Sequence, residues 1–363
     1  MQNITRKQVI ALLLALLIML VSTAVNIQVT TNGGNIKMTR VTYIDDSGAI
    51  VSGQLYVPAS ATIDTPAPAV LTNHGGGASA EAQSSYNIEL ARRGYVVLSW
   101  DASNSGSSEA SPDATHGGEA SYKFIQSLDF VQKDQLATSG HSMGGVYSYM
   151  VAQNHPENVK VEIPVGMNPG MNDTSFFGTN YVCIIGEDDE SSLVRVDGDI
   201  HNFASNPKYL ELFGMQEGDA IEFNTVYGSF TEGTARAFYI PNATHAGAMI
   251  NTELLSLYLD TVQTAVPAPN PMSGENQVWF YKDLAMIVQF VALIAFLFIF
   301  ASMLLKSTLF SGLILPERTP VGYQSGSPMW YVSLAVLLFV PTLLFIPFST
   351  ICAENRRNQS PAA

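Results

Sequence analysis

A serine set among glycines, in the hexapeptide 140–145 (GHSMGG), constrains the fold of this chain more than any other feature. Glycines at these positions leave room for a sharp turn from a strand into a helix, and such a turn holds the serine side chain at its tip. The segment 135–139 before the hexapeptide is predicted to be a strand, and the segment 146–153 after it a helix. The sequence therefore predicts a strand–turn–helix unit with Ser142 exposed at the turn.

Strands and helices are predicted to alternate around this unit. A helix at 80–93 lies between apolar strands at 67–73 and 95–100, an order that joins parallel strands. Further strands are expected at 27–30, 37–44, 50–57, 159–165, 181–185 and 235–240, and further helices at 119–133 and 249–262. The alternation predicts an α/β domain over residues 27–264, a three-layer sandwich with a mainly parallel sheet. Within it, the irregular polar segment 191–234 is expected to form a small cap.

Three apolar runs lie outside this domain. The first, within residues 1–26, follows two basic residues and is either a cleaved signal peptide or a retained signal anchor. The runs 284–305 and 330–351 are each long enough to cross a bilayer core of about 30 Å. Residues 284–351 are therefore predicted to form a pair of transmembrane helices. A Pro-rich linker at 265–283 precedes the pair, and a polar tail at 352–363 follows it.

The charges bear on orientation and on partners. Arg6 and Lys7 are expected to stay in the cytoplasm, which places the α/β domain on the extracytoplasmic side of the membrane. Arg356 and Arg357 in the tail weaken this prediction, because the same topology puts them outside as well. The net charge of −14 makes nucleic acid an unfavourable partner. The expected partners are the lipid bilayer and a small-molecule ester or acyl substrate, and no protein partner is indicated.

The hydroxyl of Ser142 is a weak nucleophile near neutral pH unless a base lies within hydrogen-bond reach and a third group orients that base. The chain has six histidines. His245 is the preferred base, because it lies in the loop 242–247 between the last predicted strand and the last predicted helix. Its position predicts that the imidazole reaches the edge of the sheet at which Ser142 is exposed.

The acid that orients this base is expected in the run 187–190 (EDDE), which directly follows a predicted strand. Asp189 is preferred from its spacing after Gly186, and Asp188 is the alternative. Four acidic residues in a row are also typical of a solvated loop or a cation site. A buried aspartate at this position would fix the tautomer of His245 and stabilise its charged form.

Backbone N–H groups are expected to stabilise a developing oxyanion. The N–H of Met143 is one such donor, and Gly75 or Gly76, after the strand at 67–73, supplies the other. His74 is interpreted as an anchor of this glycine loop. The sequence contains no H-E-x-x-H motif, cysteine cluster or EF-hand loop, so no metal or other cofactor is expected.

These motifs follow one another in the order of a known superfamily. With HGG at 74–76, GHSMG at 140–144, the turn from Gly186 to Asp189, and then His245, the chain resembles the α/β hydrolases over residues 35–260. Its segments 53–58 (GQLYVP) and 93–97 (RGYVV) resemble dienelactone-hydrolase-like and acyl-peptidase-like esterases. The resemblance implies a serine hydrolase that acts through an acyl-enzyme.

The chain departs from the superfamily at two places. Ala78 and Ser79 follow the glycines at 75–77, whereas the hormone-sensitive-lipase group commonly has an aromatic residue there, so the substrates of that group do not transfer. The predicted C-terminal helices also lie outside the pattern. We therefore predict a membrane-tethered serine hydrolase of carboxylic esters. The alternatives are a peptidase or acyltransferase that uses Ser142, Asp189 and His245, or an inactive hydrolase fold that serves as a binding module.

Overall fold

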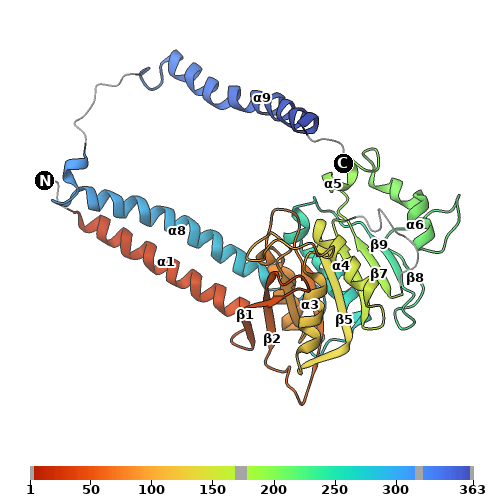
Figure 1. Cartoon of the computed structure of the whole chain (residues 1–363). Coiled ribbons are helices and arrows are strands. Elements are labelled where there is room, and N and C mark those ends of the chain that lie inside the picture. Colours follow the sequence, from red (N-terminus) through yellow and green to blue (C-terminus); the bar gives the residue numbers. More distant parts are fainter. Residues whose placement is uncertain (1–3, 168–177, 315–321, 360–363) are drawn as a thin grey trace. The chain divides into compact units, whose positions relative to one another are not determined.

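The computed structural model describes residues 4–167, 178–314 and 322–359. It divides into two compact units, one formed by Leu14–Ala295 and the other by Met1–Leu13 together with Phe296–Ala363. The α/β domain lies in the larger unit, which also holds the adjoining parts of two long apolar helices (Figure 1).

Nine strands of the described chain form one sheet in the order β1-β2-β4-β3-β5-β6-β7-β9-β8. They are β1 (Ile36–Ile44), β2 (Ile50–Pro58), β3 (Ala67–Asn73), β4 (Val96–Trp100), β5 (Val131–His141), β6 (Val159–Val165), β7 (Asn180–Ile184), β8 (Val226–Tyr227) and β9 (Arg236–Tyr239). The central strands from β4 to β9 pair in parallel, and antiparallel pairing is confined to β1, β2 and β8. The predicted mainly parallel sheet is confirmed.

Helices cover both faces of this sheet. Side chains at neighbouring strand positions point to opposite faces, so neighbours along one strand belong to two different buried clusters. Val70 of β3 belongs to a buried cluster with α2 (Ser84–Arg92) and α7 (Thr252–Ala265). Its neighbour Leu71 belongs to a second cluster with α3 (Gly118–Ser127) and α4 (Met143–Asn154). The domain is therefore the predicted three-layer sandwich.

One predicted element is wrong in extent and another is wrong in type. The helix predicted at 119–133 ends at Ser127, because Val131 already begins β5, where it pairs with Ala67 of β3. The strand predicted at 27–30 is helical and completes α1 (Arg6–Thr30). The hydroxyl of Thr31 donates to the carbonyl oxygen of Ile27 (2.7 Å), a contact between residues four apart that suits a helix end.

The segment predicted as a cap, 191–234, forms short elements beside β9. They are α5 (Glu190–Leu193), η2 (Ile200–Ser205), α6 (Pro207–Leu212) and β8. Phe203 and Tyr209 pack edge-on, and both rings lie against Phe238 of β9. The segment is therefore fixed to the sheet by aromatic contacts.

Among the residues that the structure describes, three helices are long and apolar enough to cross a membrane: α1, α8 (Trp279–Leu305) and the part Pro328–Phe345 of α9 (Pro328–Gln359). Within the larger unit the amide of Gln289 in α8 donates to the hydroxyl of Thr23 in α1 (3.0 Å). Within the smaller unit Gln8 of α1 bonds to Ser302 of α8 (3.1 Å). The polar group of Gln289 is thus satisfied by the N-terminal helix.

Candidate active site

Ser142 lies on a strained turn between β5 and α4. Its φ of 53° and ψ of −123° are uncommon for a residue with a side chain. A Cβ atom at Gly140 would lie 2.2 Å from the carbonyl of Gly144, and one at Gly144 would lie 2.5 Å from the carbonyl oxygen of Asn73. Both glycines are therefore required by close backbone contact, as the hexapeptide indicates.

The structure brings the predicted serine, base and acid together. The Nε2 atom of His245 lies 2.9 Å from the Oγ of Ser142, and its Nδ1 lies 2.8 Å from an oxygen of Asp189. A carboxylate only accepts hydrogen bonds, so Nδ1 carries the proton and Nε2 is free to accept one from the serine. The three groups therefore form one hydrogen-bonded series.

Asp189 is held rigidly at the end of this series. It is fully buried after β7, and its second oxygen accepts a hydrogen bond from the N–H of Ser192 (2.8 Å). The pKa of His245 is raised above its usual value, chiefly by the hydrogen bond to Asp189. The buried carboxylate therefore makes the imidazole a stronger base.

The other acidic residues of the run 187–190 are exposed. The N–H of Asp188, the alternative acid, bonds to the carbonyl of Ala243 (3.1 Å), and the structure places Asp189, not Asp188, against His245. Glu190 has a contact that the sequence did not indicate, because its carboxylate accepts the backbone N–H of His245 (3.0 Å). Two neighbouring acids thus hold the ring and the backbone of the same histidine.

The glycine loop after β3 lies directly beside the serine. A Cβ atom at Gly75 would lie 3.3 Å from the Cβ of Ser142, and one at Gly76 would lie 3.6 Å from the Cε of Met143. His74 holds this loop: its Nε2 accepts from the N–H of Ala102 (3.0 Å), and its Nδ1 donates to the carbonyl oxygen of Gly75 (2.8 Å). The loop brings its backbone to the place where an oxyanion donor is needed.

His141, next to the serine, has a position that the sequence did not indicate. It is 8% exposed, and burial lowers its pKa to about 4, so the ring is neutral at physiological pH. Its Nε2 lies 2.9 Å from the carbonyl oxygen of His245, and because a carbonyl only accepts, this nitrogen donates. His141 therefore fixes the backbone of the base.

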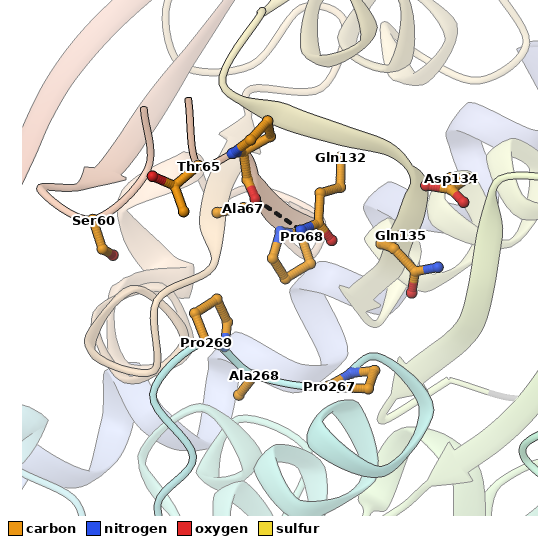
Figure 2. A pocket seen from close by; sticks show the side chains of 11 residues that line it. Ser60, Thr65, Ala67, Pro68, Gln132, Asp134, Gln135, Pro267, Ala268 and Pro269 are labelled. Atoms are coloured by element: carbon orange, nitrogen blue, oxygen red, sulfur yellow. Dashed lines mark hydrogen bonds between the residues drawn. The ribbon is translucent and has the colours of Figure 1, made fainter. Parts of the chain in front are cut away.

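A cavity of about 830 Å³ lies away from these residues, at the start of β3 (Figure 2). Its lining includes Ala67 and Pro68 at the amino end of β3, together with Pro267 and Pro269. The serine, acid and base lie at the opposite, carboxyl edge of the parallel strands. Within the described part of the chain, no group of three His, Cys, Asp or Glu side chains is placed to hold a metal ion.

Residues 68–163, from β3 to β6, match the family model described as alpha/beta hydrolase fold. Over 102 residues the chain is also 31% identical to a non-heme-haloperoxidase-like protein of Mycobacterium phage D29. That region is 28% of this chain and 36% of the phage protein, so the chain spans about a third of the length of this relative.

Two solved structures with a similar backbone are a dienelactone hydrolase from Anabaena variabilis and an S-formylglutathione hydrolase from Agrobacterium tumefaciens. The first is 14% identical, with a TM-score of 0.43 over 63% of this chain and 97% of that chain. The second is 13% identical, with a TM-score of 0.45 over 64% and 96%. The family match and the sheet order show that this chain carries the α/β-hydrolase fold.

Proposed function

We propose that this chain is a membrane-tethered serine hydrolase that cleaves carboxylic esters through an acyl-enzyme. One observation carries the proposal: the hydrogen-bonded series that runs from Ser142 through both ring nitrogens of His245 to the buried Asp189. A fold alone does not establish an activity, whereas this series is the arrangement that activates a serine hydroxyl. The α/β-hydrolase match supports hydrolase chemistry in general.

In the acylation half-reaction, Nε2 of His245 takes the proton of the Ser142 hydroxyl while Oγ bonds to the ester carbonyl carbon. The electron pair of the carbonyl moves to its oxygen and forms a tetrahedral oxyanion. Nε2–H then protonates the departing alkoxide as the carbon–oxygen bond breaks. The alcohol leaves, and the acyl group stays on Ser142.

In the deacylation half-reaction, a water molecule replaces the alcohol. His245 takes a proton from the water as its oxygen attacks the acyl carbon, and then returns that proton to Oγ of Ser142. The carboxylic acid is released, and the starting enzyme is regenerated. Asp189 stabilises the imidazolium that forms in each half.

Backbone N–H groups of Met143 and of Gly75 or Gly76 are the proposed oxyanion donors. Met143 is the first residue of α4, and the first N–H groups of a helix have no partner within the helix. A Cβ atom at Gly75 would lie 2.9 Å from Nδ1 of His141 and 3.3 Å from Cβ of Ser142, so the backbone of this loop lies close to the serine. One such donor is typically worth about a hundredfold to a thousandfold in rate.

The membrane tether is supported by the three apolar helices. Arg6 and Lys7 favour an extracytoplasmic α/β domain. Protease added to intact cells should then degrade the domain while the apolar helices stay protected. Protection of the domain in intact cells, with cleavage after lysis, would reverse the orientation.

Covalent labelling tests the nucleophile. A fluorophosphonate probe should label the full-length protein, and Ser142→Ala should abolish the label. Ser127→Ala is the matched control, because Ser127 is an exposed serine at the end of α3. Equal labelling of the wild type and Ser142→Ala would refute the assignment.

Substrate profiling separates the alternatives that use the same three residues. The ester hydrolase should turn over p-nitrophenyl esters faster than aminoacyl amides, and added alcohols should not replace water as acyl acceptor. Preference for amides would indicate a peptidase, and efficient transfer to alcohols would indicate an acyltransferase. Absence of labelling and of all turnover would favour the inactive binding module.

A further inference from the structure

A buried carboxylate attaches the membrane helix α8 to the α/β domain. Glu89 of α2 is fully buried, and one of its oxygens accepts the backbone N–H groups of Val278 (2.6 Å) and Trp279 (3.0 Å). Trp279 is the first residue of α8. A carboxylate at this point satisfies N–H groups that lack partners within the helix and interacts favourably with the helix dipole. Glu89 therefore caps α8 from the side of the domain.

Two arginines hold the segment that leads into α8. The buried Arg93 pairs with Glu89 (3.1 Å) and donates to the backbone oxygens of Ser273 (2.6 Å) and Asn276 (3.1 Å). Arg92 donates to the side chain of Asn276 (3.0 Å). The linker predicted from its prolines is thus bonded to the end of α2, so the domain and the start of α8 are firmly connected.

The contacts along α2 give the direction of α8. Trp279 contacts Glu89 near the end of α2, and Lys282, one turn later, donates to the hydroxyl of Ser84 at the start of α2 (2.6 Å). Because α2 follows β3 and its glycine loop, its start lies at the carboxyl edge of the parallel sheet. The first turn of α8 therefore runs along α2 toward the edge that carries Ser142.

The same turn of α2 also bonds to the segment that follows the base. Ser85 donates to the carbonyl of Met249 (2.7 Å), and Tyr86 donates to that of Ala248 (2.8 Å). Both carbonyls belong to η3 (Gly247–Ile250), which begins two residues after His245. One short turn of α2 therefore contacts both the membrane helix and the rim of the site.

Apolar side chains are exposed along this edge. Ile250 of η3 is 64% exposed, and Met143, beside the serine, is 40% exposed; we call these two residues the rim. On α8, Tyr281 is 52% exposed and Leu284 57% exposed. Tyrosine and lysine are typical of the membrane–water interface, and leucine of the bilayer core. The part of α8 whose residues suit the membrane–water interface thus lies beside the turn of α2 that bonds to η3.

We propose that the rim rests on the bilayer surface and that the substrate is an acyl ester of a membrane-embedded amphiphile. The inference rests on the proposed ester hydrolysis and adds the source of the substrate. The clamp of Glu89 and Arg93 fixes the first turns of α8 against α2, which sets the rim at the level where this helix enters the lipid. An ester that stays in the bilayer then reaches Ser142 without passing through bulk water.

Turnover of matched substrates tests this inference. The full-length protein in phosphatidylcholine vesicles is given a short-chain p-nitrophenyl ester in solution and a long-chain ester embedded in the same vesicles. Ile250→Asp should lower turnover of the embedded ester by at least about fivefold, because a charge opposes contact with the bilayer. Turnover of the soluble ester should stay within about twofold of wild type.

Ile63→Asp is the matched control. Ile63 is 71% exposed and lies in the connection between β2 and β3, at the amino edge of the parallel sheet. It should leave both activities unchanged. Equal effects of the two substitutions on the embedded ester would overturn the inference, whereas loss of soluble-ester turnover by the wild type would overturn the proposed function itself.

A second measurement needs no substrate. In a Cys352→Ser background, an environment-sensitive fluorophore is attached to Ile250→Cys or to Ile63→Cys. Quenchers carried on the lipid should quench the label at position 250 and leave the label at position 63 bright. A label at position 250 that stays bright would show that the rim does not meet the bilayer, and equal quenching at both positions would show that the contact is not specific to the rim.

Discussion

The Nε2 atom of His141 donates a hydrogen bond of 2.9 Å to the carbonyl oxygen of His245, so the residue before the nucleophile holds the backbone of the base. The two rings lie 4.7 Å apart between their centroids. Burial keeps His141 neutral, with its pKa lowered to about 4. The strained turn at Ser142 therefore positions both the nucleophile and, through its neighbour, the imidazole that activates it.

Removal of this donor should misplace the base. His141→Leu is expected to lower kcat on a soluble ester by about tenfold to a hundredfold with little change in KM, because displacement of a reacting group by about 1 Å costs that much. His141→Gln, which keeps an N–H donor, should recover part of the loss. A higher KM with an unchanged kcat would contradict this role.

The pH profile should report the coupling of His245 to Asp189. The base works in its neutral form, so kcat/KM should rise with pH through the pKa of His245. That pKa lies above the usual value of about 6.5, because the hydrogen bond to Asp189 favours the charged ring. The half-maximal point is therefore expected above pH 6.5. A profile that is flat from pH 5 to 9 would remove His245 from the reaction.

Asp189→Asn should lower kcat by about ten-thousandfold, the size of the equivalent change in a serine protease, because the amide favours the wrong tautomer of His245. The matched control is Asp188→Asn, since this neighbour is exposed and its side chain is not placed against the ring. The control should stay within about twofold of wild type. A larger loss for Asp188→Asn than for Asp189→Asn would exchange their roles.

The strands of the sheet could be predicted from local sequence patterns, because most of them are short apolar runs. Apolar runs that stop shortly before a glycine loop, such as β3 before the glycines at 75–77, remain strands in the fold. The helix over 27–30 was missed because those residues alternate in polarity, whereas continuation of the apolar helix α1 decides their conformation. The order of the motifs along the chain also predicted that His245 and Asp189 lie at one edge of the sheet, because the carboxyl ends of parallel strands meet at the same edge.

The contacts that support the site could not be predicted in the same way. His141 and Glu190 bond to the backbone of His245. Every residue has the same backbone groups, so the sequence does not indicate which of them a side chain will contact. The attachment of α8 was hidden for a similar reason. Glu89 and Arg93 are separated by one helical turn, a spacing that is common on helix surfaces, although both are buried against the chain near Trp279.

Glu162 of β6 should make stability depend on pH. It is fully buried between Thr138 and Ser148, and burial raises its pKa to about 8. The folded state therefore binds a proton that the unfolded state releases above about pH 4.3, and stability should fall as pH rises from there to about 8. Glu162→Gln should flatten this decline and raise the Tm of the detergent-solubilised protein at pH 8. Parallel declines of the Tm of both proteins would contradict the assignment.

Gly75 should tolerate no side chain, because a Cβ atom there would lie 2.9 Å from Nδ1 of His141 and 3.3 Å from Cβ of Ser142. Gly75→Ala is expected to lower kcat by about a hundredfold or more, since the backbone beside the serine must shift and an oxyanion donor is lost. Gly76→Ala is the matched control, because its Cβ would meet only the flexible end of Met143, at 3.6 Å. It should cost less than about fivefold in kcat. Both variants should keep the Tm of the wild type within a few degrees, which separates an effect on the reaction from unfolding, and equal losses of kcat would mean that the spacing beside Ser142 does not matter.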